Sequence, residues 1–293
     1  MSFRKYKIEK DYKNVYYFLK EKGFSENYIK NLRKEFGYIK VNNVSNIIRT
    51  PLHINDILEI EASPNNKTTI MRCIIPLNIV YEDEYYLLVN KESGISCMPN
   101  KSHYSYNLAG AICAYMQDKD KNFTLRIINR LDKDTAGIII IAKDSISQQE
   151  IKDVNKIYTA ICHGKIDKPI LIDKNIETEI ENNMGNKINI IKRKISKNGK
   201  KAVTKVIPLK CNEKASLIEL ELIHGRTHQI RVHLSSINHA LIGDEIYGTK
   251  SELINHTALI CNQVSFYHPY LHEHLNFSIP YPNDFNNLLN ELF

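Results

Sequence analysis

The stretch INRLDKDTAGIIIIAKD, residues 128–144, places two charged side chains directly before one of the most apolar segments of the chain. Arg130 and Asp132 stand two residues apart, and four isoleucines follow at residues 138–141. Because these isoleucines do not alternate with polar residues, they predict a central strand covered on both faces. A carboxylate beside such a strand is costly unless it is paired and hydrogen-bonded. The segment by itself leaves two interpretations of Asp132 open, a functional carboxylate or an ordinary loop salt bridge or cap.

The residues on either side of this segment read mostly as short strands. Runs such as NIVYEDEYYLLVNK and SLIELELI have β-type composition, and the clearest helix is predicted at residues 106–116. Many strands with few helices predict an α+β domain built on a largely antiparallel sheet. We expect this domain to cover residues 75–293.

Residues 14–37 predict two short helices joined by a turn. Asn14 and Ser25 are suitable N-cap residues, and Gly23 and Gly37 are suitable stops. Two short alternating segments, YIKVNN and DILEIEA, then predict strands. Residues 63–74 begin with SPNNKTT, which is rich in turn-forming residues and predicts a linker.

Positive charge is concentrated at the start of the chain. The whole chain of 293 residues has a net charge of +7, and residues 1–50 alone hold 12 Lys and Arg against 5 Asp and Glu. On the second predicted helix, Lys30, Arg33 and Lys34 lie opposite the apolar face, which indicates either an RNA-binding surface or a solvated helix face. Residues 12–62 resemble the small αL-type RNA-binding domain, and this resemblance favours RNA.

The cysteines and the hydropathy pattern bear on the compartment. Six cysteines are scattered without a CxxC pair, and no apolar run approaches the roughly 20 residues that a membrane span needs. We therefore expect reduced thiols in a cytoplasmic protein that does not enter a membrane.

Histidines gather in residues 221–248, where a metal site has to be considered. His224, His228 and His233 follow one another at intervals of four and five residues, but no acidic residue stands at a familiar ligand spacing. We expect no metal here, and capping or phosphate contacts explain these polar residues better.

Four segments together resemble the RluA-type pseudouridine synthases. NRLDKDTAGIIIIAK is similar to one signature of that family, and GRTHQIRVHL followed by HALIGDEIYG is similar to the other. YEDEYYLLVNKESGISCMP and NKIYTAICHGKI resemble the family's opening strand and its tyrosine segment. The resemblance covers about residues 75–285. This chain departs from the family pattern at Asn129, where His is usual, and at Glu92, where Pro is usual.

The resemblance implies that the chain isomerises uridine in RNA to pseudouridine without a metal, nucleotide or other cofactor. It implies a catalytic role for Asp132, with Arg231 as its ion-pair partner and Tyr158 against the target base. Asp134 is interpreted as a turn residue. We expect RNA contacts from both signatures and from the basic helix, that is from Arg130, Arg226, His228, Gln229, Lys30, Arg33 and Lys34.

The RNA partner is less closely defined. The two-part layout suggests large-subunit ribosomal RNA by analogy with the family, and transfer RNA is the alternative. The basic stretch at residues 191–201, with six Lys and Arg, is either a further RNA contact or a solvated hairpin. A non-catalytic RNA-binding protein and a glycosidase with two carboxylates are the other classes considered. We expect the protein to be a monomer.

Overall fold

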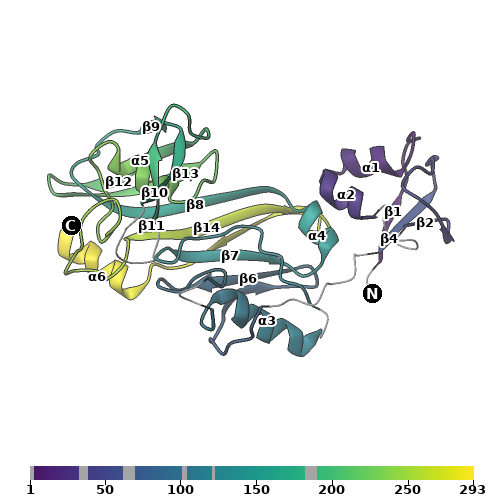
Figure 1. Cartoon of the computed structure of the whole chain (residues 1–293), viewed down its shortest axis with the longest axis horizontal. Helices are drawn as coiled ribbons and strands as arrows, with labels where there is room; N and C mark the ends of the chain where they lie inside the picture. Colours follow the sequence, from purple (N-terminus) through teal and green to yellow (C-terminus); the bar gives the residue numbers. More distant parts are fainter. Residues whose placement is uncertain (1–2, 33–38, 62–69, 101–103, 121–122, 182–189) are drawn as a thin grey trace.

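The structure, a computed structural model, describes residues 3–32, 39–61, 70–100, 104–120, 123–181 and 190–293. It contains two units, which lie side by side in Figure 1. The N-terminal unit comprises the described residues up to 61, and the larger unit comprises those from 70 onward; the larger unit is called the catalytic unit because it contains the residues that are expected to act in catalysis. No helix in these ranges is both long enough and apolar enough to cross a bilayer.

The N-terminal unit is a four-stranded sheet packed against two helices. The sheet has the order β1-β4-β2-β3, and all of its pairs are antiparallel. Asn14 caps the first helix by accepting a hydrogen bond from the Tyr17 amide, and Gly23 ends it with a φ of 94°, as predicted. The elements are β1 (Phe3–Lys7), α1 (Val15–Glu21), α2 (Glu26–Leu32), β2 (Ile39–Val41), β3 (Val44–Ser45) and β4 (Ile57–Glu61).

The N-terminal sheet includes residues that precede the expected start of this domain at residue 12. Strand β1 pairs with β4 along its whole length, from Phe3 opposite Glu61 to Lys7 opposite Ile57. The predicted second helix extended to residue 37, but residues 33–38 lie outside the described ranges, and so does most of the predicted linker. The described part of that linker, residues 70–74, runs irregularly along helix α3 (Leu108–Lys119), where the Cys73 amide donates to the Gly110 carbonyl.

The catalytic unit is built on a nine-stranded sheet. Its strands follow the order β5-β6-β7-β14-β8-β13-β12-β9, and β15 pairs with β14. All neighbours are antiparallel except β7 and β14, so the α+β class with a largely antiparallel sheet is confirmed. The strands are β5 (Asn78–Glu82), β6 (Tyr86–Lys91), β7 (Ala136–Ala142), β8 (Lys152–His163), β9 (Ile170–Asp173), β12 (Val203–Cys211), β13 (Ala215–Leu222), β14 (Leu259–His268) and β15 (Glu273–Ser278).

Strand β7 is the central buried strand that the isoleucine run predicts. All seven of its residues are buried, and it lies between β6 and β14. Gly137 permits the close approach of β14, because a Cβ at this position would lie 2.3 Å from the Cys261 carbonyl oxygen. Its φ of 126° also favours glycine. The loop that carries Asp132 thus enters a rigid and fully covered strand.

Four helices complete the catalytic unit. Helix α3 (Leu108–Lys119) contributes Leu108, Ile112 and Met116 to the main core, and Asn107 caps it through the Gly110 amide. This confirms the helix predicted at 106–116, with a start two residues later. Helices α4 (Ser145–Glu150), α5 (Gln229–Ser235) and α6 (Asn283–Leu292) follow β7, β13 and β15.

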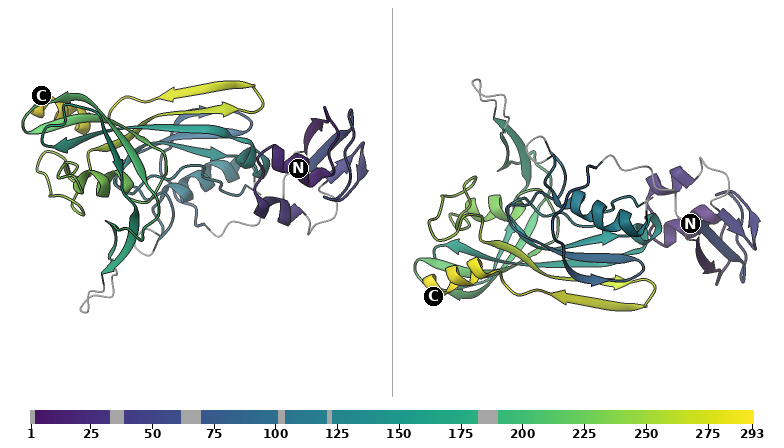
Figure 2. Two further views of the ribbon diagram at one scale, coloured as in Figure 1. Left: turned by 90° about the horizontal axis from the view of Figure 1, so that it is seen from above. Right: turned by 90° about the horizontal axis from the view of Figure 1, so that it is seen from below.

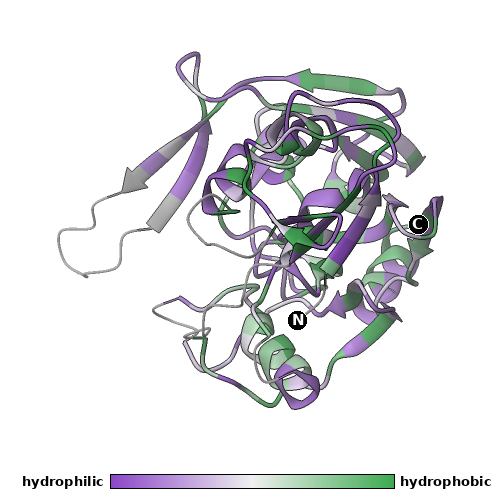
Figure 3. Ribbon diagram, turned by 90° about the vertical axis from the view of Figure 1, so that its right-hand side faces the viewer, coloured by the Kyte–Doolittle hydropathy of each residue, from purple (hydrophilic) through white to green (hydrophobic). Residues whose placement is uncertain are grey.

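A separate hairpin of β10 (Ile176–Glu181) and β11 (Ile190–Ile195) projects from the catalytic unit in both views of Figure 2. Figure 3 shows that its strands are largely hydrophilic. The basic residues of β11 face an acidic strand, with Glu177 opposite Lys194 and Glu179 opposite Lys192. Lys194 also forms an ion pair with Glu179 at 3.2 Å. Part of the positive charge of residues 191–201 is therefore balanced within the hairpin.

Candidate active site

The loop that carries Asp132 is held in place by its backbone carbonyls. Lys91, which is almost fully buried, donates from its Nζ to the Lys133 carbonyl at 2.9 Å. The thiol of Cys97 donates to the Leu131 carbonyl, and the Ser93 hydroxyl donates to the Asp134 carbonyl. Three side-chain donors from residues 91–97 thus fix the backbone on both sides of Asp132.

Lys91 binds two further carbonyls, those of Glu92 and Ile95. Burial lowers the pKa of Lys91 to about 8, against the opposing effect of nearby acidic groups. The side chain therefore works as a buried hydrogen-bond donor that joins the end of β6 to the Asp132 loop. Sequence reasoning did not single out this residue.

The three residues that the family resemblance implies for catalysis meet at one pocket. Asp132, Tyr158 and Arg231 all line it, although they come from the loop before β7, from β8 and from α5. The Asp132 side chain is a quarter exposed at this surface, whereas Arg231 is almost fully buried. A partly exposed carboxylate beside a buried cation can reach a ligand while remaining compensated.

Arg231 has two acidic neighbours at different distances. Its Nε and Nη2 donate to the two carboxylate oxygens of Asp244 at 2.8 and 2.7 Å, and its Nη1 lies 4.0 Å from Asp132 Oδ2. Burial acts to lower the pKa of Arg231, but the hydrogen bonds and charge of Asp244, together with Asp132, raise it overall. The primary partner of Arg231 is therefore Asp244, and the expected pairing with Asp132 is the longer contact.

Asp244 is fully buried and was not selected from the sequence. It also accepts hydrogen bonds from the Ile246 and Tyr247 amides, so its charge is fully compensated. The preceding Gly243 has a φ of 74°, and a Cβ there would lie 2.2 Å from the His256 carbonyl oxygen. Both residues stand in HALIGDEIYG, so the resemblance contained a signal for this carboxylate.

His228 lines the pocket together with Arg231, and the ring of Tyr247 packs against the His228 imidazole. The Nε2 of His228 lies 3.9 Å from Asp132 Oδ2, and its Nδ1 lies 2.8 Å from the Tyr247 hydroxyl. Burial lowers the pKa of His228, and the positive charges of Arg231 and Arg193 lower it further. The negative charge of Asp132 acts in the opposite direction, but the net effect is a lowered pKa. A neutral imidazole therefore faces the carboxylate at neutral pH. His228 also has a left-handed backbone, with a φ of 56°.

Tyr158 lies on β8, where its partner across the sheet is Leu220. The side chain is buried, and this burial raises its pKa well above 10. The acidic groups of Cys261 and Asp132 raise it further. Tyr158 therefore faces the pocket as a neutral phenol, which combines a flat apolar ring with a polar hydroxyl.

A wider open cleft of about 700 Å³ surrounds the carboxylate, within the size range of small-ligand sites. Among the described residues that line it, Asp132 is the single carboxylate. Five cations line the same cleft, namely Arg130, Lys133, Lys156, Arg193 and Arg226. This distribution favours an anionic ligand that presents one uncharged group to Asp132.

The remaining RNA-binding expectations fall into three groups. Arg130 and Arg226 are exposed at the cleft, although the Nε of Arg226 donates to the Lys201 carbonyl. Gln229 is buried and uses its side chain internally, donating to the Val203 carbonyl and accepting from the Arg226 amide. Lys30 is exposed on α2 of the N-terminal unit. Arg33 and Lys34 lie outside the described residues.

The two departures from the family pattern have different structural roles. Asn129 is buried, and its side chain donates to the Ile138 carbonyl and accepts from the Ile140 amide. It thereby ties the segment before Asp132 to β7, as a strand partner would. Glu92 is exposed and contributes its backbone carbonyl to Lys91.

The histidines of the second signature do not converge. Within the described ranges, no three His, Cys, Asp or Glu side chains are placed to hold a metal ion. His233 is buried between Thr204 and the Lys174 carbonyl, at 2.9 Å from each. None of the six cysteines, all of which lie in the described residues, forms a disulfide, and four of them are buried.

Comparisons with known proteins show which family this chain resembles. Residues 85–236 match the family described as RNA pseudouridylate synthase. The uncharacterized RNA pseudouridine synthase YhcT of Bacillus subtilis is 35% identical over 87% of this chain and 85% of its own length. The ribosomal large subunit pseudouridine synthase D of Neisseria meningitidis (strain Z2491) is 33% identical over 74% of this chain and 61% of its own length.

The fold has a solved counterpart in the structure titled human RNA pseudouridylate synthase domain containing 4. The two align with a TM-score of 0.57 and 25% identity, over 73% of this chain and 92% of that one. The family match over residues 85–236 contains the first signature and the GRTHQIRVHL part of the second, and residues of both segments line one pocket in the structure. The chain belongs to the RNA pseudouridine synthase family, whose members are isomerases that act on uridine in RNA.

Proposed function

We propose that this protein isomerises a uridine of large-subunit ribosomal RNA, with Asp132, Tyr158 and Arg231 as its catalytic residues. The observation that carries the proposal is their convergence on one pocket inside a cleft whose other charged lining residues, where the structure describes them, are cations. One carboxylate serves the chemistry, and the surrounding cations serve the phosphates of the substrate.

The reaction is an isomerisation in which all atoms are conserved. The bond between N1 of uracil and C1′ of ribose breaks, the base turns, and C5 bonds to C1′. The proton on C5 is lost, and N1 gains one, so no oxidant or reductant is consumed. The site has to supply a carboxylate next to the sugar and base, a surface for the rotating ring, and a place from which water is excluded.

Asp132 is the proposed reacting group, by attack on the sugar, attack on the base, or proton removal from the sugar. Arg231 supports each of these routes, because its charge lies 4.0 Å from the carboxylate and Asp244 holds it in a fixed plane. His228, neutral and 3.9 Å from the same oxygen, adds a polar group without a second full charge.

Tyr158 is proposed to lie against the target base. Its raised pKa argues for a neutral phenol, which suits ring packing and hydrogen bonding better than removal of the C5 proton by a phenolate. A substitution to phenylalanine separates these roles, because it keeps the ring and removes the hydroxyl.

A uridine reaches this pocket only after it leaves the RNA stack, which costs a few kcal/mol and less in a loop than in a duplex. Arg130, Lys133, Lys156, Arg193 and Arg226 are proposed to offset this cost through phosphate contacts, together with the basic surface of the N-terminal unit. Ribosomal RNA is favoured because the similar protein of Neisseria meningitidis is named for the large ribosomal subunit.

The protein is further proposed to act as a monomer without a cofactor. The cytoplasm is the proposed compartment, and six described cysteines without a disulfide among them fit its reducing conditions.

The test uses unmodified large-subunit ribosomal RNA and a pool of unmodified transfer RNAs, both transcribed in vitro. Each RNA is incubated with the full-length protein without added metal or cofactor, and pseudouridine is mapped by base-specific chemical labelling. The proposal requires a new pseudouridine in the ribosomal RNA, no change in RNA mass and no released uracil. Modification of transfer RNA alone would assign the alternative substrate, and released base would indicate hydrolysis.

A further inference from the structure

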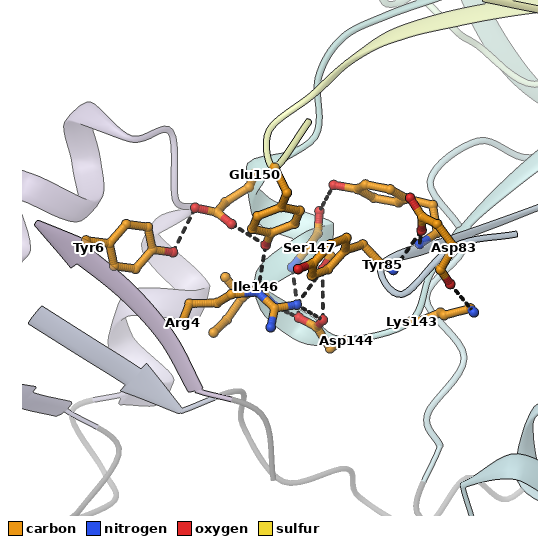
Figure 4. Close-up of polar contacts among 11 residues, drawn as sticks. Arg4, Tyr6, Asp83, Tyr85, Lys143, Asp144, Ile146, Ser147 and Glu150 are labelled. Atoms are coloured by element: carbon orange, nitrogen blue, oxygen red, sulfur yellow. Dashed lines mark hydrogen bonds and ion pairs between the residues drawn. The ribbon is translucent and has the colours of Figure 1, made fainter. Parts of the chain in front are cut away.

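The N-terminal unit is docked on the catalytic unit through helix α4. Figure 4 shows side chains of β1 meeting those of α4 and of the turn before β6. The hydrogen bonds that join the two units link residues more than 100 positions apart in the sequence. Since α4 directly follows β7, the strand that begins at the Asp132 loop, the docking site and the catalytic loop lie at opposite ends of one buried strand.

Arg4 is the central residue of this contact and is nine-tenths buried. Its Nη2 donates to Asp144 Oδ2 at 2.6 Å and to the Ser147 hydroxyl at 3.3 Å, and its Nε donates to the Tyr270 hydroxyl at 2.9 Å. The guanidinium also lies over the rings of Tyr85 and Tyr270, at 4.6 and 4.9 Å from their centroids. A planar cation with three directed bonds and two ring faces accepts one orientation.

Glu150, at the other end of α4, makes a second polar contact. It accepts hydrogen bonds from Tyr6 on β1 at 2.7 Å and from Tyr270, and it is itself buried. The Ser25 amide, at the start of α2, donates to the side chain of Gln149 at 3.0 Å. The N-terminal unit is thus held from both its sheet and its helices.

An apolar anchor lies between these polar contacts. Ile146 of α4 is fully buried in the hydrophobic core of the N-terminal unit, among residues such as Ile8, Val15 and Phe18. The two units are therefore not joined by a flexible tether alone. Burial of the apolar Ile146 side chain favours their association, and the buried polar contacts fix the orientation of one unit relative to the other.

We propose that Arg4 is a positioning residue for substrate selection. By fixing the N-terminal unit to α4, it sets the separation between the basic surface of that unit and the Asp132 cleft. An RNA is then bound best when the distance between its target uridine and the part that contacts the N-terminal unit equals this separation. The inference rests on the proposed function for the identity of the substrate, but the docking itself can be measured without RNA.

Three full-length variants isolate the docking contact. Arg4→Ala removes the ion pair and the ring contacts, and Tyr6→Phe removes one buried hydrogen bond without changing charge. Lys7→Ala is the matched control, since Lys7 lies exposed on the same strand and loses the same charge as Arg4→Ala. Circular dichroism and thermal melting establish that each variant is folded before it is compared.

The first readout is small-angle X-ray scattering of each protein without RNA. We expect the wild type and Lys7→Ala to match the docked structure, and Arg4→Ala to show a larger radius of gyration. Tyr6→Phe should lie between them. An unchanged scattering profile for both Arg4→Ala and Tyr6→Phe would overturn the docking role of these residues, whether or not the protein modifies any RNA.

The second readout compares two probes, the in vitro transcribed large-subunit ribosomal RNA and a short stem-loop around the uridine that the wild type modifies in it. We expect Arg4→Ala to raise KM for the long RNA roughly 3- to 10-fold, because the two contacts are no longer pre-organised. Its kcat on the stem-loop should equal that of the wild type. Expanded scattering with unchanged KM for the long RNA would reject the role in selection, and equal losses on both RNAs would show a general structural defect instead.

Discussion

Asp244 holds the Arg231 guanidinium through two hydrogen bonds, of 2.8 and 2.7 Å, and leaves its Nη1 turned toward Asp132 at 4.0 Å. The two carboxylates therefore have different tasks, which a single carboxylate paired with Arg231 could not combine. Asp244 compensates the buried cation, and Asp132 remains available to a substrate. Charge that develops near Asp132 during the reaction meets a cation whose position is already fixed, so little reorganisation is needed.

Asp132→Asn should abolish isomerisation, because the amide keeps the shape of the side chain but cannot act as a charged nucleophile or base. We expect turnover to fall roughly 10⁴-fold or more, with RNA affinity within a few fold of the wild type. Site-resolved pseudouridine mapping and RNA binding measure the two effects. Asp134→Asn is the matched control and should retain activity, and wild-type turnover in Asp132→Asn would remove this residue from the mechanism.

Arg231→Lys should be poorly tolerated, although it keeps the positive charge. Lysine cannot reproduce the planar fork that binds both oxygens of Asp244, so it cannot hold a second nitrogen toward Asp132. We expect kcat to fall roughly 100-fold and the free energy of unfolding to fall by about 2 kcal/mol. Single-turnover kinetics and chemical denaturation check the two numbers. A lysine variant with the wild-type rate would assign Arg231 a purely structural role.

Lys91 should make stability depend on pH in the alkaline range. Burial lowers its pKa to about 8, below the ordinary value of 10.5, so between these values the unfolded chain binds more protons than the folded one. The free energy of unfolding of the wild type should therefore rise, relative to Lys91→Met, by about 2 kcal/mol between pH 8 and pH 10.

The buried thiols of Cys162 and Cys261 act in the opposite direction. Their pKa values are raised to about 12, so the folded protein keeps protons that the unfolded chain loses, and stability falls with increasing pH. This effect is common to the wild type and to Lys91→Met, and it cancels in the comparison. Parallel stability curves for the two proteins from pH 8 to pH 10 would contradict the role of Lys91.

The basic residues Lys30, Arg33 and Lys34 should contribute to RNA affinity through phosphate contacts. A full-length variant with Lys30→Ala, Arg33→Ala and Lys34→Ala should bind ribosomal RNA more weakly. The slope of its log affinity against log salt should be reduced by about 2 to 3 if all three residues meet phosphates. The control replaces Lys165, Lys205 and Lys210, which are exposed on the catalytic unit. Equal slopes for both triple variants would show that Lys30, Arg33 and Lys34 do not contact phosphates.

Full-length variants are preferable to a chain that begins after residue 69. Removal of the N-terminal unit would expose Ile146, which is fully buried in the core of that unit. It would also leave Asp144 and Glu150 without Arg4 and Tyr6. A loss of solubility or activity in the shortened chain would thus mix RNA binding with the loss of docking.

The amino-acid sequence by itself determined the parts of this protein that depend on neighbours along the chain. The unbroken isoleucines of residues 138–141 required a strand covered on both faces, and β7 is that strand. Asn14 and Gly23 marked the ends of a helix through local hydrogen bonds and backbone freedom. Each of the two signatures is a short run of neighbouring residues, so the sequence alone was enough to name Asp132 and Arg231 as candidates.

Only the tertiary structure decided which distant groups meet. Asp244 becomes the partner of Arg231 because the chain turns at Gly243 and brings the carboxylate to a residue of α5. Lys91 reaches the Asp132 loop because β6 and β7 are neighbours. Arg4 contacts Asp144, which is 140 positions away in the sequence. Lys5 and Lys7 lie on the same strand but are exposed to solvent. A charged residue in a short strand has the same sequence signal whether it faces water or a partner. The physical reason is that desolvation and hydrogen-bond geometry depend on the packing of whole elements, which no local pattern contains.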